Sequence, residues 1–145
     1  MINDGHTINE IIKNIMSDDF LNKDYIFTRM NYGLEILGRK EEETDIKVKQ
    51  FIIDNYKNKL LFFTVNHPTN ILLNEVLRQL LLKLGLKQVD ILNDPEYISN
   101  DKALIYPSVL RHLETTFEYI IHYDEYHEYF ETYIKVLYPN FYKSC

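Results

Sequence analysis

Residues 60–84 show the clearest pattern of apolar and polar positions in the chain. The segment 60–65, LLFFTV, is apolar almost throughout and shows no polar alternation, which is typical of a strand buried on both faces. The polar turn 66–70, NHPTN, follows it. Apolar residues then recur at helical spacing until Gly85, a residue type that commonly ends helices. The pattern therefore predicts a strand at 60–65 followed by a helix at 69–84.

The turn 66–70 is the first place where the pattern predicts function. We expect Asn66 or His67 to cap the helix, with Pro68 in its first turn. Proline has no N–H, and the N–H groups of the first turn have no partner within the helix, so no hydrogen bond is lost there. A buried strand that leads through a polar turn into a helix is half of a βαβ unit. Ligands of open α/β sheets bind beyond the carboxyl ends of the strands, so a ligand site is expected at this turn.

The rest of the chain is predicted to be mainly helical. Thr7 and Glu10 match a capping box, S/T-x-x-E, at the start of a first helix. A mainly helical stretch with an interruption at Gly38 is expected over 24–56. The pattern then predicts, in chain order, short strands at 88–92 and 103–106, a helix that begins near Ser108, and a last helix that Asp124 caps and Pro139 ends.

The expected strand raises a physical problem, because unpaired backbone groups in a core are costly and the chain offers only two other short strands. Either another chain or segment completes a larger sheet, or the sheet is minimal and packed under helices. In both cases the expected fold class is α/β, seen in this chain alone as a mostly helical α+β arrangement with few short strands.

Length, composition and charge narrow the class of protein. A chain of 145 residues that is 46% hydrophobic and 26% charged, without repeats or linkers, is expected to fold as a single domain, 1–145. The net charge is −6, and residues 112–134 contain six acidic side chains and no Lys or Arg. An acidic chain without a basic stripe argues against nucleic acids and anionic membranes as partners.

The sequence shows no targeting pattern. No apolar run has the length of a transmembrane helix, and the first residues lack the pattern of a signal peptide. The single cysteine, Cys145, permits no disulfide within one chain, which fits a reducing compartment. The expected location is the cytoplasm.

The residues of the turn admit two interpretations. His67 could act as a general base or bind a ligand directly. Asn66, Thr69 and Asn70 could donate hydrogen bonds to a phosphate or carbonyl group at the helix N-terminus. The alternative is structural, because the same residue types cap helices and form turns without any ligand.

Candidate residues outside the turn have stronger structural alternatives. Ser108 follows Tyr106 and Pro107, but no G-x-S-x-G motif surrounds it, so a turn or capping role is favoured over a nucleophile. Arg78 and Arg111 could bind phosphates, although pairing with nearby acidic residues is favoured.

The segment 122–128, HYDEYHE, has the composition of a metal site. Its two histidines are five residues apart and diverge on a helix, and no H-E-x-x-H motif is present, so no metal is expected. The tyrosines of 119–142 could stack on a base or a sugar, although at helical spacing a core or partner surface is favoured. Cys145 lacks the electropositive enclosure of a catalytic thiolate.

Four stretches of the chain carry a resemblance to a known family. Residues 39–56 fit the array R-x-E-x-x-x-D-I-x-V-x-x-F-I-x-x-N-Y, and residues 61–75 fit L-F-x-T-x-N-H-P-T-N-x-L-L-x-E. Leu-Gly-Leu at 84–86 and Ile-Tyr-Pro-Ser-Val at 105–109 follow. Over roughly residues 30–115 the chain thus resembles the carboxyl-terminal half of the WcbI family of polysaccharide biosynthesis proteins, regarded as acetyltransferases of bacterial capsule pathways.

The resemblance implies an SGNH-like sheet flanked by helices, of which this chain would supply half. It also implies an acyltransferase that binds coenzyme A or acetyl-CoA and acts on a sugar or nucleotide-sugar acceptor. His67 is then the catalytic candidate, and the residues expected to bind the cofactor are Asn66, Thr69, Asn70, Tyr106 and Ser108. The family's Gly-Asn-Cys-Gln turn, with its suspected catalytic cysteine, is absent, so this chain is expected to need an amino-terminal half, a partner chain or a second copy for catalysis.

A rival hypothesis assigns no catalytic activity to the chain. The chain could be a non-enzymatic helical interaction or assembly module, in which the 66–70 turn is structural and the acidic, tyrosine-rich carboxyl-terminal surface meets a protein partner.

Overall fold

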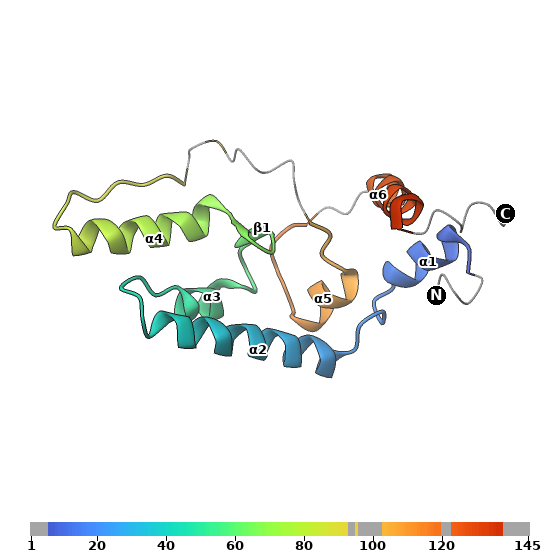
Figure 1. Cartoon of the computed structure of the whole chain (residues 1–145), viewed down its shortest axis with the longest axis horizontal. Coiled ribbons are helices and arrows are strands. Elements are labelled where there is room, and N and C mark those ends of the chain that lie inside the picture. The colour runs from blue at the N-terminus through green and yellow to red at the C-terminus, as the bar shows by residue number, and fades with distance from the viewer. Residues whose placement is uncertain (1–5, 93–94, 96–102, 120–122, 138–145) are drawn as a thin grey trace.

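The computed structural model describes residues 6–92, 95, 103–119 and 123–137. This part of the chain forms six helices and one sheet of two short strands, so the expectation of a mostly helical α+β fold is confirmed. Figure 1 shows an elongated arrangement, with α2 along one side, α4 along the other and α3 between them. Helices α1 and α6 lie together at the end of the molecule away from α4.

Helix α1, Ile8–Ile15, begins with the expected capping box. The Thr7 hydroxyl accepts the N–H of Glu10 at 3.3 Å, and the Glu10 carboxylate accepts the N–H of Thr7 at 2.8 Å. Ile11, Ile12 and Ile15 are buried, and α1 packs against α6. The sequence pattern therefore identified this helix and its apolar side correctly.

Helix α2, Lys23–Glu41, continues through Gly38, so the expected interruption there is wrong. One glycine in a helix interior costs only about 1 kcal/mol, which the surrounding helical turns can offset. Helix α3, Lys49–Asn55, follows, and its N-cap residue Val48 has no side chain that could cap it. The Glu41 carboxylate accepts the N–H groups of Val48 and Lys49 instead, at 2.5 and 2.8 Å.

Strands β1, Phe62–Thr64, and β2, His67–Pro68, form an antiparallel hairpin. The expectation of a strand buried on both faces is wrong, because burial alternates along the segment. Phe63 is 8% exposed, whereas Phe62 is 37% and Val65 98% exposed. Successive side chains of a strand point to opposite faces, and only one face of this hairpin is covered.

The hairpin also replaces the expected half of a βαβ unit. Residues 88–92 and 103–106 were expected as strands, and neither segment is a strand in the structure. The 103–106 segment is bonded to β1 where the Ala103 N–H donates to the Phe63 carbonyl at 2.6 Å. Of the two alternatives for the sheet, the described residues show the minimal one.

Helix α4, Asn70–Lys83, confirms the helix expected at 69–84, although its N-cap is Thr69 and not Asn66 or His67. Pro68 belongs to β2 and lies outside the first turn of the helix. The expected glycine stop is confirmed. Gly85 has φ +66°, and the N–H of Leu86 donates to the Leu81 carbonyl at 2.9 Å, as in a Schellman motif.

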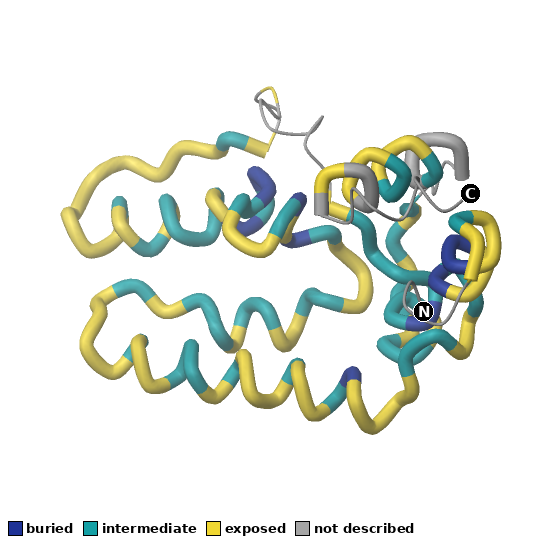
Figure 2. The backbone as a smooth tube through the Cα atoms, turned by 45° about the vertical axis from the view of Figure 1, so that its right-hand side comes forward, coloured by how far each residue is buried: buried dark blue, intermediate teal, exposed yellow. Residues whose placement is uncertain are grey.

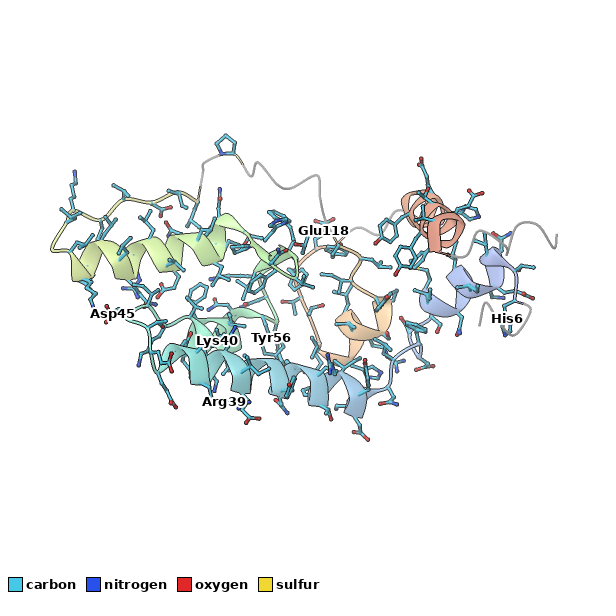
Figure 3. All side chains as sticks on the ribbon, viewed as in Figure 1. His6, Arg39, Lys40, Asp45, Tyr56 and Glu118 are labelled. Atoms are coloured by element: carbon cyan, nitrogen blue, oxygen red, sulfur yellow. The ribbon has the colours of Figure 1, made fainter. Side chains whose placement is uncertain are left out.

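The far end of α4 is tied to the loop between α2 and α3. The Gln79 side-chain amide bonds both backbone groups of Lys47, at 2.7 and 2.9 Å. Lys83 forms an ion pair with Asp45, whose side chain lies near the end of α4 in Figure 3. Polar contacts thus hold this end of the molecule together, where Figure 2 shows no buried residue.

Helix α5, Pro107–His112, begins with a proline at its first position, close to the helix expected from Ser108. Helix α6, Tyr123–Leu137, begins one residue before Asp124, so Asp124 is not its N-cap. Pro139, expected to end this helix, lies outside the described residues. None of the helices in the described ranges is long and apolar enough to cross a membrane.

The buried residues form separate groups rather than one large core (Figure 2). One group lies on α1, and another lies where β1 meets the start of α4 and contains Leu61, Phe63 and Leu72. The second group includes the polar residues Thr69 and Asn70. The last two residues of the turn predicted as a ligand site are therefore buried, whereas Asn66 at its start is exposed.

Candidate functional site

Thr69 fixes the end of the turn to the chain segment before β1. Its N–H donates to the Leu61 carbonyl and its hydroxyl donates to the Leu60 carbonyl, both at 2.9 Å. The residue is 2% exposed, so these bonds are shielded from water. Thr69 was predicted to bind a ligand, but its hydroxyl proton is committed to the Leu60 carbonyl.

This use of Thr69 affects the N-terminus of α4. Thr69 is the N-cap residue, yet its side chain accepts no hydrogen bond from the first turn of the helix. The first amide groups of a helix have no partners within it and carry the positive end of the helix dipole. In a helix of 14 residues these groups can bind an anion or a carbonyl oxygen.

His67 lies in β2, two residues before this N-cap, and is half-buried. Its Nδ1 atom is shielded from solvent and has no hydrogen-bond partner among the described residues. An unsatisfied buried polar atom costs about 1–3 kcal/mol, and such atoms in native structures call for an explanation. His67 does not cap α4, so the capping role expected for it is wrong.

The two asparagines of the turn differ in their surroundings. Asn66 is exposed, and its side-chain oxygen accepts the Thr64 hydroxyl proton at 3.0 Å. Asn70 is the first residue of α4 and is 9% exposed. Asn66 therefore shapes the surface of the hairpin, whereas Asn70 belongs to the buried group.

Tyr106 and Ser108, also predicted to bind the cofactor, lie at the start of α5. The Tyr106 ring packs edge-on against Phe20, with ring centroids 5.1 Å apart. Burial raises the pKa of the Tyr106 hydroxyl, and the nearby Tyr129 and Tyr133 add to the increase. Ser108 is fully buried and its hydroxyl has no partner in the described part of the chain.

Both arginines considered as phosphate ligands form ion pairs instead, as the sequence favoured. Arg78 forms two hydrogen bonds with Glu75, at 2.7 and 2.8 Å, and they lower the pKa of the Glu75 carboxyl. Arg111 pairs with Asp19 at 2.7 Å.

The residues of the metal-like segment 122–128 are only partly described. His127 forms a hydrogen bond with the Asn9 side chain at 3.0 Å, which places it against α1. His122 lies outside the described residues, as does Cys145. Within those residues no three His, Cys, Asp or Glu side chains are grouped as metal ligands.

Sequence reasoning missed the carbonyl groups that hold the turn. The sequence shows Leu60 and Leu61 only as apolar residues of a strand. The identity of a side chain does not reveal whether the backbone carbonyl of that residue accepts a hydrogen bond from a distant residue. The pairing of Thr69 with this strand could have been suspected from its position after Pro68, which has no N–H to donate.

Comparison with known proteins yields one match. Residues 1–89 match the family model described as "Polysaccharide biosynthesis enzyme WcbI". The match begins at residue 1 and not near residue 30, and it ends before the 105–109 stretch that contributed to the expected resemblance. No curated protein and no solved structure matches the chain. The matched residues include the whole 66–70 turn and all of α4, and they make up more than half of the sequence, so the chain belongs to the WcbI family of polysaccharide biosynthesis enzymes.

Proposed function

We propose that the 66–70 turn and the N-terminus of α4 bind coenzyme A or an acyl-CoA, and that the chain takes part in acyl transfer to a sugar during polysaccharide synthesis. The membership of the WcbI family supports the polysaccharide part of this proposal. The acyl transfer, the cofactor and the acceptor are proposals.

One observation carries the assignment to the turn. The buried Nδ1 of His67 lacks a partner in the described structure, two residues from a helix N-terminus that its own N-cap side chain leaves uncapped. A ligand with an anionic group and hydrogen-bonding atoms would satisfy both features at once. Coenzyme A offers phosphates, amide groups and a thioester when acylated.

The chain's residues then have distinct roles. The amide groups at the start of α4 would bind an anionic or carbonyl oxygen, with Asn66 and Asn70 at either end of the turn. His67 would accept the proton of the sugar hydroxyl as a C–O bond to the acyl group forms and the C–S bond breaks. Coenzyme A supplies the acyl group as a thioester and leaves as the thiol. Tyr106 and Ser108 stay predicted ligand contacts.

Thermal unfolding with and without 1 mM coenzyme A or acetyl-CoA tests this proposal. A ligand at 100 times its dissociation constant stabilises by about 2.7 kcal/mol, which raises the melting temperature by several degrees in a chain of this size. We expect His67→Ala and Asn70→Ala to abolish the shift. His6→Ala, which removes an exposed histidine of the segment before α1, is the matched control and should keep it.

Pantetheine separates the two parts of the site, because it lacks the phosphates of coenzyme A. A smaller shift with pantetheine would agree with an anion at the start of α4. A cooperative transition at the same temperature with and without both coenzymes would refute the proposal, and so would a shift that both turn variants retain.

A further inference from the structure

Two tyrosines of α6 present an exposed aromatic surface. Tyr129 is 60% and Tyr133 50% exposed. Their ring centroids are 6.2 Å apart and the ring planes differ by 13°. The two residues are one helical turn apart, so the rings form two nearly parallel platforms along the helix.

Neighbouring aromatic residues support these platforms. Phe130 meets Tyr129 edge-on, at a centroid distance of 5.6 Å and an angle of 83°. Tyr106, whose ring packs on Phe20, lies close enough to Tyr129 and Tyr133 for their hydroxyls to affect its own. Side chains held by their neighbours lose little conformational entropy when a ligand binds.

A groove of about 490 Å³ runs beside the two rings. In the described part of α6 it is lined by Glu128, Tyr129, Thr132, Tyr133 and Val136. The volume lies within the range of small-molecule sites, about 300–1,000 Å³. Its described lining combines aromatic and aliphatic carbon with one carboxylate, from Glu128, and three hydroxyls, from Tyr129, Thr132 and Tyr133.

The charge of the groove limits what can occupy it. None of the five lining side chains is basic, and Glu128 would repel an anion. At these five side chains, phosphorylated ligands, nucleic acids and acidic sugars are therefore disfavoured. Uncharged sugars fit, because their C–H faces stack on aromatic rings while their hydroxyls bond to carboxylate and hydroxyl oxygens.

We propose that this groove of α6 binds an uncharged stretch of a polysaccharide chain, with Tyr129 and Tyr133 stacking on two successive sugar rings and Glu128 and Thr132 bonding their hydroxyls. The inference rests on the proposed function, to which it adds the sugar site. The family match ends at residue 89 and assigns no role to α6. Figure 1 shows α6 away from α4, with β1 between them in this view, so the sugar site and the turn are distinct.

Calorimetric titration with cellohexaose and maltohexaose, two uncharged hexasaccharides of different linkage, tests the proposal. We expect at least one of them to bind. Tyr133→Ala should weaken its binding about ten-fold, the size expected for loss of one stacking platform. Tyr133→Phe keeps the ring and should bind nearly as the parent does. Tyr32→Ala removes a tyrosine of α2 that is 52% exposed, and it should have no effect.

Several outcomes would overturn the sugar site. They are no binding of either hexasaccharide, equal binding by Tyr133→Ala, or tighter binding of an acidic hexagalacturonate. Sedimentation equilibrium tests the remaining possibility, that a second copy of the chain occupies the groove. A dimer that Tyr133→Ala dissociates, without any sugar binding, would show that the groove is an interface between two copies.

The proposal of a sugar site and the proposal of a coenzyme site can be refuted independently of each other. Tyr133→Ala should keep the thermal shift with coenzyme A, and His67→Ala should keep hexasaccharide binding. Loss of sugar binding in a chain that still responds to coenzyme A overturns this inference alone. The reverse result overturns the assignment of the turn and leaves the groove as a sugar site.

Discussion

Thr69 shows how a single residue can shape a site without being free to bind in it. Its N–H and hydroxyl both donate to carbonyl groups of the segment that leads into β1, and the residue is almost fully buried. The two bonds hold the turn against the strand and keep the side chain away from the helix N-terminus. The Thr69 side chain therefore makes no capping bond to the first turn of α4.

Removal of the Thr69 hydroxyl should destabilise the chain. Thr69→Val keeps the shape of the side chain but leaves the part-buried Leu60 carbonyl without its donor, so the free energy of unfolding should fall by about 1–3 kcal/mol. Urea denaturation measures the change. Thr28→Val alters an exposed threonine of α2 and should change the free energy by less than about 0.5 kcal/mol. Equal stability of the two variants would show that the buried bond contributes little.

Some helix ends were predictable from the sequence and others were not. The capping box of α1 and the glycine after α4 were predicted correctly, because each depends on a few neighbouring residues. The N-caps expected for α4 and α6 were wrong. The start of α3 was less predictable, because its cap is the carboxylate of Glu41, a residue of α2. Contacts between elements of this kind have no fixed sequence spacing.

Two glycines in different elements should respond to alanine in opposite directions. Gly85 has φ +66°, where a side chain is strained, so Gly85→Ala should lower the free energy of unfolding by about 1 kcal/mol. Gly33 lies inside α2 and a Cβ there would meet nothing within 4 Å, so Gly33→Ala should raise it by up to about 1 kcal/mol.

Chemical denaturation of both glycine variants checks this pair. Neither added methyl group would clash, so the difference between them isolates the backbone conformation. A loss of stability in both variants would indicate that Gly33, too, is needed for its conformation or packing.

At the scale of the whole molecule, the fold class was predictable and the sheet was not. The segment 60–65 is apolar apart from Thr64, but an apolar sequence does not show which face will be covered, and Val65 is almost fully exposed. The position of the candidate site was predictable because a polar turn interrupts an apolar pattern. Its bonding was not, since the acceptors are backbone carbonyls of Leu60 and Leu61.

The stability of the whole chain should fall in acid. Hydrogen bonds from Arg78 lower the pKa of Glu75, those from Thr7 lower the pKa of Glu10, and that from Lys57 lowers the pKa of Glu114. A carboxyl whose pKa is lower in the folded state stabilises the fold above its unfolded value, about 4.3 for Glu. This stabilisation is lost as the pH falls from there through the folded pKa.

Urea denaturation at several pH values between 7 and 3 measures this loss. Glu75→Gln removes one of the three carboxyls and should make the decline below about pH 4.3 shallower. Glu118→Gln removes an exposed carboxylate outside these three bonds. It is the control for the loss of one negative charge without the loss of one of these bonds. An unchanged acid slope in Glu75→Gln would show that its ion pair with Arg78 has no net effect.

The bonds that join the second half of the chain to β1 have a consequence for the order of folding. Thr116 bonds the carbonyl of Lys57 across 59 residues, and Ala103 bonds the carbonyl of Phe63. Closing such long loops costs entropy before any contact repays it, so local structure forms sooner. We expect the hairpin and α4 to form early, and the segment from Ala103 to Thr116 to attach late. The 66–70 turn would then form before α6 is in place.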